Sequence, residues 1–78
     1  MRRFRDREGF EWDVVLGRES WGASVALFVP VTDTDRGVRQ AVLTAAAYDA
    51  AVRELDGLDD PGLQALLDRS QPKEEGQG

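Results

Sequence analysis

The chain has 78 residues, of which 41% are hydrophobic and 32% charged, and its formal net charge is −5. This length and composition predict one folded domain with a single core. There is no His and no Cys, so the chain lacks the usual general base near neutral pH, the strongest nucleophile and the two best transition-metal ligands. The absences argue against most catalysis and metal binding, and the negative charge argues against general nucleic-acid affinity.

The first half of the chain predicts strands. Residues 3–5 form a short strand, and residues 6–9 have the Asp and Gly of a tight hairpin. Over residues 10–16 the side chains alternate, and one face carries Phe10, Trp12, Val14 and Leu16. A period of two marks a half-buried strand.

A connector over residues 17–22 precedes a third strand at residues 25–31, which is apolar on both faces. Such a strand is central in its sheet, or its second face is covered by helices or by a partner. We assign Phe28 to that second face. A polar turn at residues 32–37 leads to a fourth strand at residues 38–43.

The second half predicts two helices. Thr44 is a natural N-cap for a helix over residues 45–55, and Gly57 ends this helix in the left-handed capping conformation. Asp60 caps a second helix with Pro61 in its first turn. The apolar stripe of that helix consists of Leu63, Leu66 and Leu67.

Together the elements predict an α+β fold, in which a small antiparallel β-meander of about four strands is followed by a C-terminal α-helical hairpin packed on one face. Residues 1–72 form the single domain, and residues 73–78 form a disordered polar tail. The predicted core consists of Phe4, Phe10, Trp12, Val14, Leu16, Val25, Leu27, Val29, Val42, Tyr48, Val52, Leu55, Leu58, Leu63, Leu66 and Leu67.

Candidate catalytic groups are limited to the carboxylates Asp13, Glu19, Asp33 and Asp35. Acid–base work needs a cleft and a tuned pKa, and nothing in the sequence brings these four together, so we interpret them as solvated charges. The residues after Asp33 do not match a calcium-binding loop. We expect no enzyme activity, no cofactor, no metal and no small-molecule substrate.

Two features suggest contact with partners. Trp21 lies in the connector, where it either caps the small core, which we favour, or anchors a partner. Arg2, Arg3, Arg5 and Arg7 surround Phe4, and they either face an acidic helical layer or solvent, bind phosphate, or dock on an acidic protein surface. The candidate partner-binding residues are therefore Trp21, Phe28, Arg3 and Arg5.

The leading hypothesis is a small non-catalytic bacterial protein-binding module, acting as an accessory or regulatory subunit of a larger assembly or as a homo-oligomer. The alternative is a nucleic-acid-associated regulator that uses the N-terminal arginines. The excess of Arg over Lys is typical of a GC-rich bacterial genome. Because the basic start has no apolar stretch behind it and the longest apolar run is short, we expect a cytoplasmic location without membrane insertion.

Overall fold

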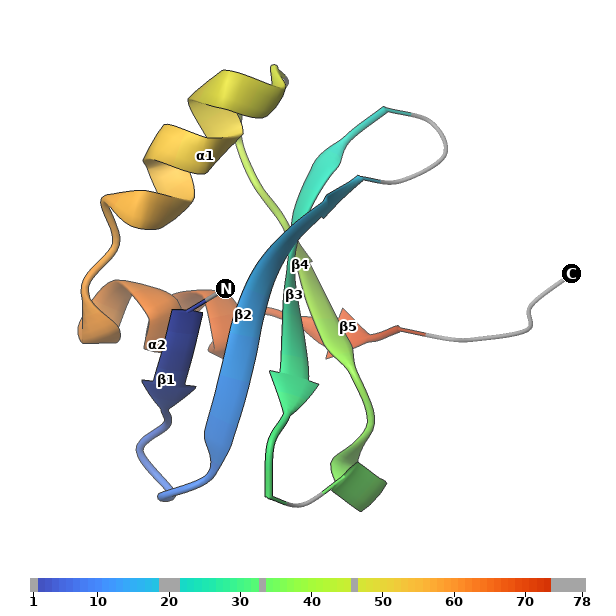
Figure 1. The fold of residues 1–78 in the computed structure, drawn as a ribbon, viewed down its shortest axis with the longest axis vertical. Coiled ribbons are helices and arrows are strands. Elements are labelled where there is room, and N and C mark those ends of the chain that lie inside the picture. The colour runs from blue at the N-terminus through green and yellow to red at the C-terminus, as the bar shows by residue number, and fades with distance from the viewer. Residues whose placement is uncertain (1, 19–21, 33, 46, 74–78) are drawn as a thin grey trace, which may run out of the picture.

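The computed structural model describes residues 2–18, 22–32, 34–45 and 47–73, and Figure 1 shows the course of the chain. The elements in order are β1 (Arg2–Arg5), β2 (Glu11–Arg18), β3 (Ser24–Pro30), the short 3-10 helix η1 (Thr34–Arg36), β4 (Arg39–Val42), α1 (Tyr48–Asp56), α2 (Asp60–Asp68) and β5 (Gln71–Pro72). No helix within the described residues is long and apolar enough to cross a membrane.

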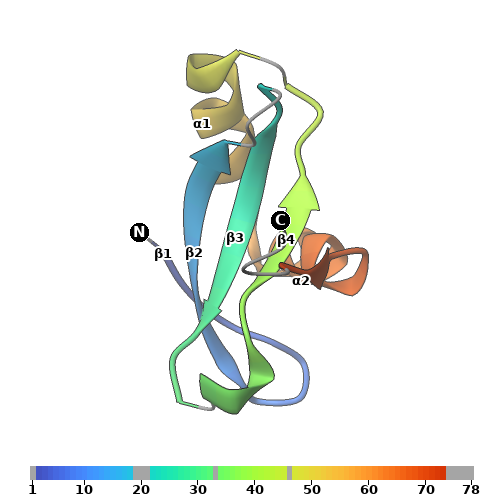
Figure 2. The ribbon, with the colours of Figure 1, turned by 90° about the vertical axis from the view of Figure 1, so that its right-hand side faces the viewer.

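The five strands form one antiparallel sheet in the order β1-β2-β3-β4-β5, which confirms the predicted α+β class. Both helices contribute to the core on one face of this sheet. Figure 2 shows β2, β3 and β4 side by side, with α1 near one end of the sheet and α2 beside β4.

The core lies between that face and the helices, and aromatic side chains fill its centre. The register places Phe4 opposite Trp12, and Val14 opposite Phe28. The Phe28 ring meets the Phe4 and Trp12 rings edge-on, at centroid distances of 6.4 and 6.3 Å. Edge-to-face contacts of this kind add to the hydrophobic gain from burying the rings. The helices complete the core with Ala51, Leu55, Leu63 and Leu66.

The predicted orientation of β3 was wrong. Phe28 is fully buried in the core, at 0% exposure, and does not lie on the second face. Because side chains alternate across the sheet, Val25, Leu27 and Val29 point to the opposite face. Val25 is nevertheless buried there, as predicted, whereas Val29 is 36% exposed.

The predicted faces of β4 are reversed in the same way, and one predicted core residue of α1 is exposed. Ala41 and Leu43 are buried, and Val42, predicted in the core, is 45% exposed. Tyr48, also predicted in the core, is 53% exposed at the first turn of α1. Phe10 is only half-buried, and the Arg36 guanidinium lies over its ring, 3.4 Å from the centroid.

Strand β2 is longer than predicted, because it continues through Gly17 and Arg18 instead of ending in a connector. Gly17 lies opposite Val25. A Cβ at this glycine would come within 2.8 Å of Leu27 Cδ1. The missing side chain at Gly17 therefore lets Leu27 pack across the strand.

Thr44 does not cap α1, which begins later, at Tyr48, with Ala47 in the N-cap position. The Thr44 hydroxyl and the Ala45 N–H instead donate to the Glu54 carboxylate, at 2.9 and 3.0 Å. Partial burial works to raise the pKa of Glu54, but these hydrogen bonds outweigh it and hold the pKa below its ordinary value. Glu54 thus ties the segment before α1 to the last turns of that helix.

The junction between the helices also differs from expectation. Gly57 ends α1 with φ −80°, so its conformation is not left-handed. Asp59, rather than Asp60, caps α2, and its carboxylate accepts the Gly62 N–H at 3.0 Å. Pro61 occupies the first turn as predicted.

The chain returns to the sheet after α2 as the short edge strand β5, which the sequence did not predict. Arg39 of β4 pairs with Pro72 and donates side-chain hydrogen bonds to the Ser70 hydroxyl and carbonyl. The Lys73 N–H donates to the Val38 carbonyl at 2.8 Å. Lys73 therefore belongs to the folded part and not to the predicted tail, whose other residues lie outside the described ones.

Candidate interaction surfaces

The N-terminal arginines are engaged within the chain. On the sheet face away from the helices, Arg3 Nε donates to Asp13 Oδ1 at 2.7 Å, and Arg5 pairs with Glu11 at 2.9 Å. These contacts follow from the register, which places Arg3 opposite Asp13 and Arg5 opposite Glu11. The hydrogen bond that Arg3 donates to Asp13, together with the negative charge of Asp13, raises the pKa of Arg3.

The other two arginines of this segment reach the helices. Arg7 forms a bidentate pair with Asp68 of α2, with both distances 3.0 Å. Arg2 donates to the Leu55 carbonyl at the end of α1, at 3.4 Å. Each arginine around Phe4 therefore has a partner in its own chain, which leaves less positive charge available to phosphate groups than the sequence suggested.

The face of the sheet opposite the helices, here called the open face, carries an apolar patch. It consists of Val15, Leu27, Val29 and Val42, which are half-buried or exposed, around the buried Val25. Within the described residues, no helix or strand covers this patch. The ion pairs of Arg3 and Arg5 border it on the β1 side.

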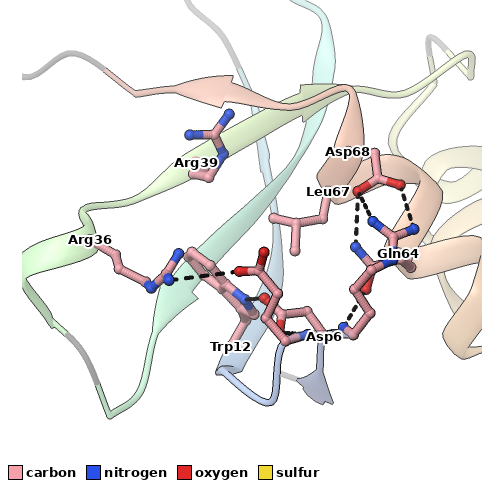
Figure 3. A pocket seen from close by; sticks show the side chains of 9 residues that line it. Asp6, Trp12, Arg36, Arg39, Gln64, Leu67 and Asp68 are labelled. Carbon is pink, nitrogen blue, oxygen red and sulfur yellow. Dashed lines mark hydrogen bonds and ion pairs between the residues drawn. The ribbon is translucent and has the colours of Figure 1, made fainter.

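A second feature is a cavity of about 250 Å³ between the first hairpin, η1 and α2, which Figure 3 shows from close by. Asp6 lies at its base and is buried. The Asp6 carboxylate accepts hydrogen bonds from the Glu8 and Phe10 N–H groups, both at 2.9 Å, and from Trp12 Nε1 at 3.0 Å. Asp6 therefore organises the hairpin and orients the core tryptophan.

The electrostatics of this cavity are internally balanced. Burial works to raise the pKa of Asp6, but the hydrogen bonds from Trp12, Phe10 and Glu8, with the charge of Arg36, hold the pKa below its ordinary value. Arg36 also lies 3.9 Å from Glu8. The lining residues that the structure describes present as many carboxylates as guanidinium groups, so they favour neither anions nor cations.

The candidate carboxylates do not converge in the described part of the chain. Asp13 is ion-paired on the open face, and Asp35 is exposed in η1. Glu19 and Asp33 lie outside the described residues. Among the residues that the structure describes, no cluster of three or more His, Cys, Asp or Glu could hold a metal ion.

The scan against protein-family models and the searches of curated proteins and solved structures find no match to this chain.

Of the predicted partner-binding residues, Arg3 and Arg5 lie beside the apolar patch, Phe28 lies in the core, and Trp21 falls outside the described residues. Sequence reasoning missed Val29 and Val42, because it assigned them to the core. One available signal was residue size: a small core takes the largest aromatic of a strand that is apolar on both faces, which leaves the valines outside.

Proposed function

We propose that this chain is a small non-catalytic protein-binding module, and that its open face packs against the same face of a second copy. The single observation that carries the proposal is the apolar patch centred on Val29 and Val42, at 36% and 45% exposure. Two antiparallel sheets with apolar faces pack face to face in β-sandwiches, and this arrangement would cover the patch. Within a larger assembly, this dimer would be the accessory or regulatory subunit.

The charges on the open face do not oppose a second copy as the occupant. Copies of a chain with a net charge of −5 repel each other. On the open face, however, the charges of Arg3 and Arg5 cancel those of Glu11 and Asp13. Face-to-face packing also places the acidic helices on the two outer sides of the dimer, where their mutual repulsion is weakest.

The N-terminal arginines support this proposal better than the nucleic-acid alternative. Their ion pairs with Asp13, Glu11 and Asp68 would have to break, or be shared, before the guanidinium groups could contact phosphates. A chain of overall negative charge adds a long-range repulsion.

Sedimentation equilibrium from micromolar to millimolar concentration tests the proposal. We expect a monomer–dimer equilibrium in the wild type, and a monomer in Val42→Glu and Val29→Glu, because each variant buries an unpaired carboxylate in the interface. Val42→Thr is the matched control, since Thr keeps the shape and strand preference of Val and should weaken the dimer less.

A wild-type chain that stays monomeric over the whole range would refute the second copy as occupant. A dimer that Val42→Glu and Val29→Glu leave intact, with the fold retained by circular dichroism, would refute the open face as the interface.

A further inference from the structure

We propose a second binding site, in which an extended peptide segment with an acidic residue adds as a strand to the free edge of β2, beside α1. Apart from Val15, which also belongs to the open face, the described residues of this site lie on the helix side of the sheet, and the proposal does not depend on the dimer proposed above. Three observations support this site: a backbone edge without a described partner strand, an apolar groove next to that edge, and the basic side chain of Arg18 at one end of the groove.

The backbone edge arises because β1 is shorter than β2. β1 begins at Arg2, opposite Val14, whereas β2 continues to Arg18. The Phe10 carbonyl accepts a hydrogen bond from Asp6 on the β1 side, and the Glu11 carbonyl accepts one from Val31 on the β3 side.

Backbone groups alternate in direction along a strand, so those of Leu16 and Arg18 point to the β1 side, as those of Phe10 do. Among the residues that the structure describes, no strand pairs with Leu16 or Arg18 there. Such an edge accepts a further strand through main-chain hydrogen bonds.

The groove beside this edge has a volume of about 360 Å³. Its apolar lining comes from β2 and from α1, which stands next to that part of the strand in Figure 1. The apolar lining residues are Val14, Val15, Leu16, Tyr48, Val52 and Leu55. Tyr48 is 53% exposed, so its ring is accessible to an occupant of the groove.

The rim charges indicate what the occupant carries. The Arg18 guanidinium lies over the Tyr48 ring, 5.7 Å from its centroid. At the other end of the groove Arg2 and Asp56 both contribute to the lining and offset each other. Within the described residues Arg18 forms no ion pair with a carboxylate, so the end of the groove at Arg18 attracts an acidic side chain.

The geometry of paired strands then predicts the sequence pattern of the peptide that fits this edge. A segment antiparallel to β2 meets Arg18 first and Leu16 two residues later, and both of those positions face α1. The segment therefore has an acidic residue opposite Arg18 and, two residues on, an apolar residue that enters the groove between Leu16, Tyr48 and Val52. A second copy carries a full net charge of −5 and is repelled more strongly than a segment with one acidic residue, so we take the segment as the occupant.

The probe is the blocked peptide acetyl-Thr-Glu-Thr-Ile-Thr-amide, titrated into the isotopically labelled full chain and followed by NMR. We expect the largest shifts and slowed amide exchange at Leu16 and Arg18. The same peptide N-methylated at Ile keeps every side chain but loses the N–H that would donate to the Leu16 carbonyl, and we expect its Kd to be at least about tenfold weaker.

Two matched variants test whether the positive charge of Arg18 attracts the peptide. Arg18→Glu should weaken binding at least about tenfold, whereas Arg53→Glu, the same change on α1 outside the groove lining, should change the Kd less than about twofold. Val42→Glu should leave peptide binding unchanged, so failure of the dimer and failure of this site are distinguishable.

Four outcomes would overturn the proposal: no binding at millimolar peptide, equal binding of the N-methylated peptide, equal effects of Arg18→Glu and Arg53→Glu, or shifts confined to the open face. Slowed exchange at Leu16 and Arg18 that grows with protein concentration, without peptide, would show that a second copy occupies the edge instead.

Discussion

Replacing Asp6 should damage the fold more than any other single change to a charged residue of the first hairpin. Asp6 is 8% exposed, and its carboxylate accepts three hydrogen bonds, from the Glu8 N–H, the Phe10 N–H and Trp12 Nε1. In Asp6→Ala all three donors lose their acceptor. Water can reach the turn amides in part, but it reaches the indole N–H of Trp12, which is 1% exposed, only through the space beside the cavity that the carboxylate leaves.

The expected cost follows from these contacts. An unsatisfied buried donor costs about 1–3 kcal/mol, and hydrogen bonds to a charged acceptor contribute about 1.5–3 kcal/mol each before water replaces part of them. Asp6→Ala should therefore lower the free energy of unfolding by about 3–5 kcal/mol. That is as much as the core of a domain this size supplies, so most of the variant should be unfolded at 25 °C.

Asp6→Asn separates the two roles of the carboxylate. The amide oxygen can still accept the turn N–H groups, but the NH₂ group then faces the indole N–H of Trp12. Urea denaturation followed by circular dichroism should show a loss of about 1–3 kcal/mol. In a Trp12→Phe background, which removes the indole donor, the same substitution should cost about 1–2 kcal/mol less. Additivity within about 0.5 kcal/mol would refute the proposed coupling.

The pH dependence gives an independent check. The pKa of Asp6 is lowered in the folded chain, so its contribution is fully present above the unfolded pKa of about 3.9 and is lost as the pH falls through the folded value. Stability should therefore decline below about pH 4 less steeply in Asp6→Asn than in the wild type. The exposed carboxylate of Asp35 provides a control, and a similar change in slope for Asp35→Asn would contradict the assignment to Asp6.

Three further predictions concern packing and the Glu54 contacts, each measured by urea denaturation. Leu63→Ala should cost about 2–5 kcal/mol, because that side chain is fully buried under the sheet. Gly17→Ala should cost about 1 kcal/mol through the contact with Leu27, and Leu27→Val in the same chain should make the alanine less costly. Glu54→Gln should cost about 1–2 kcal/mol at neutral pH, since the amide replaces one acceptor oxygen by a donor facing the Thr44 segment. The pKa of Glu54 is lowered in the folded chain, so this cost should shrink below about pH 4, as the wild-type carboxylate becomes protonated.

The first hairpin could be predicted from the sequence because its polar residues mark the two faces. Glu11 and Asp13 must stay near water, so Trp12 and Val14 point inward. Asp6 and Gly9 supply the turn chemistry, and Gly9 has the positive φ of 90° that such a turn requires. Residues of the hairpin itself therefore encode its turn, and contacts from α2, such as the Gln64 side chain that accepts the Arg7 N–H at 2.7 Å, come in addition.

The features that the sequence did not predict depend on contacts between residues that are distant in the sequence. Thr44 is a good N-cap by type, but its hydroxyl donates to Glu54, ten residues away. Strand β5 has only two residues, one of them a proline, and it exists because Arg39 and Val38 bind the chain that leaves α2. No local pattern encodes such pairings, which form only when the sheet and α2 are already adjacent.

The error in β3 and the proposed dimer have the same physical origin. A strand that is apolar on both faces does not indicate which face is the core, and the face that the helices leave uncovered becomes apolar surface. Packing resolves the choice in favour of Phe28, whose ring contacts Phe4 and Trp12, and Val29 is left outside. Phe28→Ser would therefore remove about 3–5 kcal/mol of core packing and report on folding, not on association. Val42→Glu changes the uncovered face and leaves the core intact, so it is the substitution that can separate a defect in partner binding from a defect in the fold.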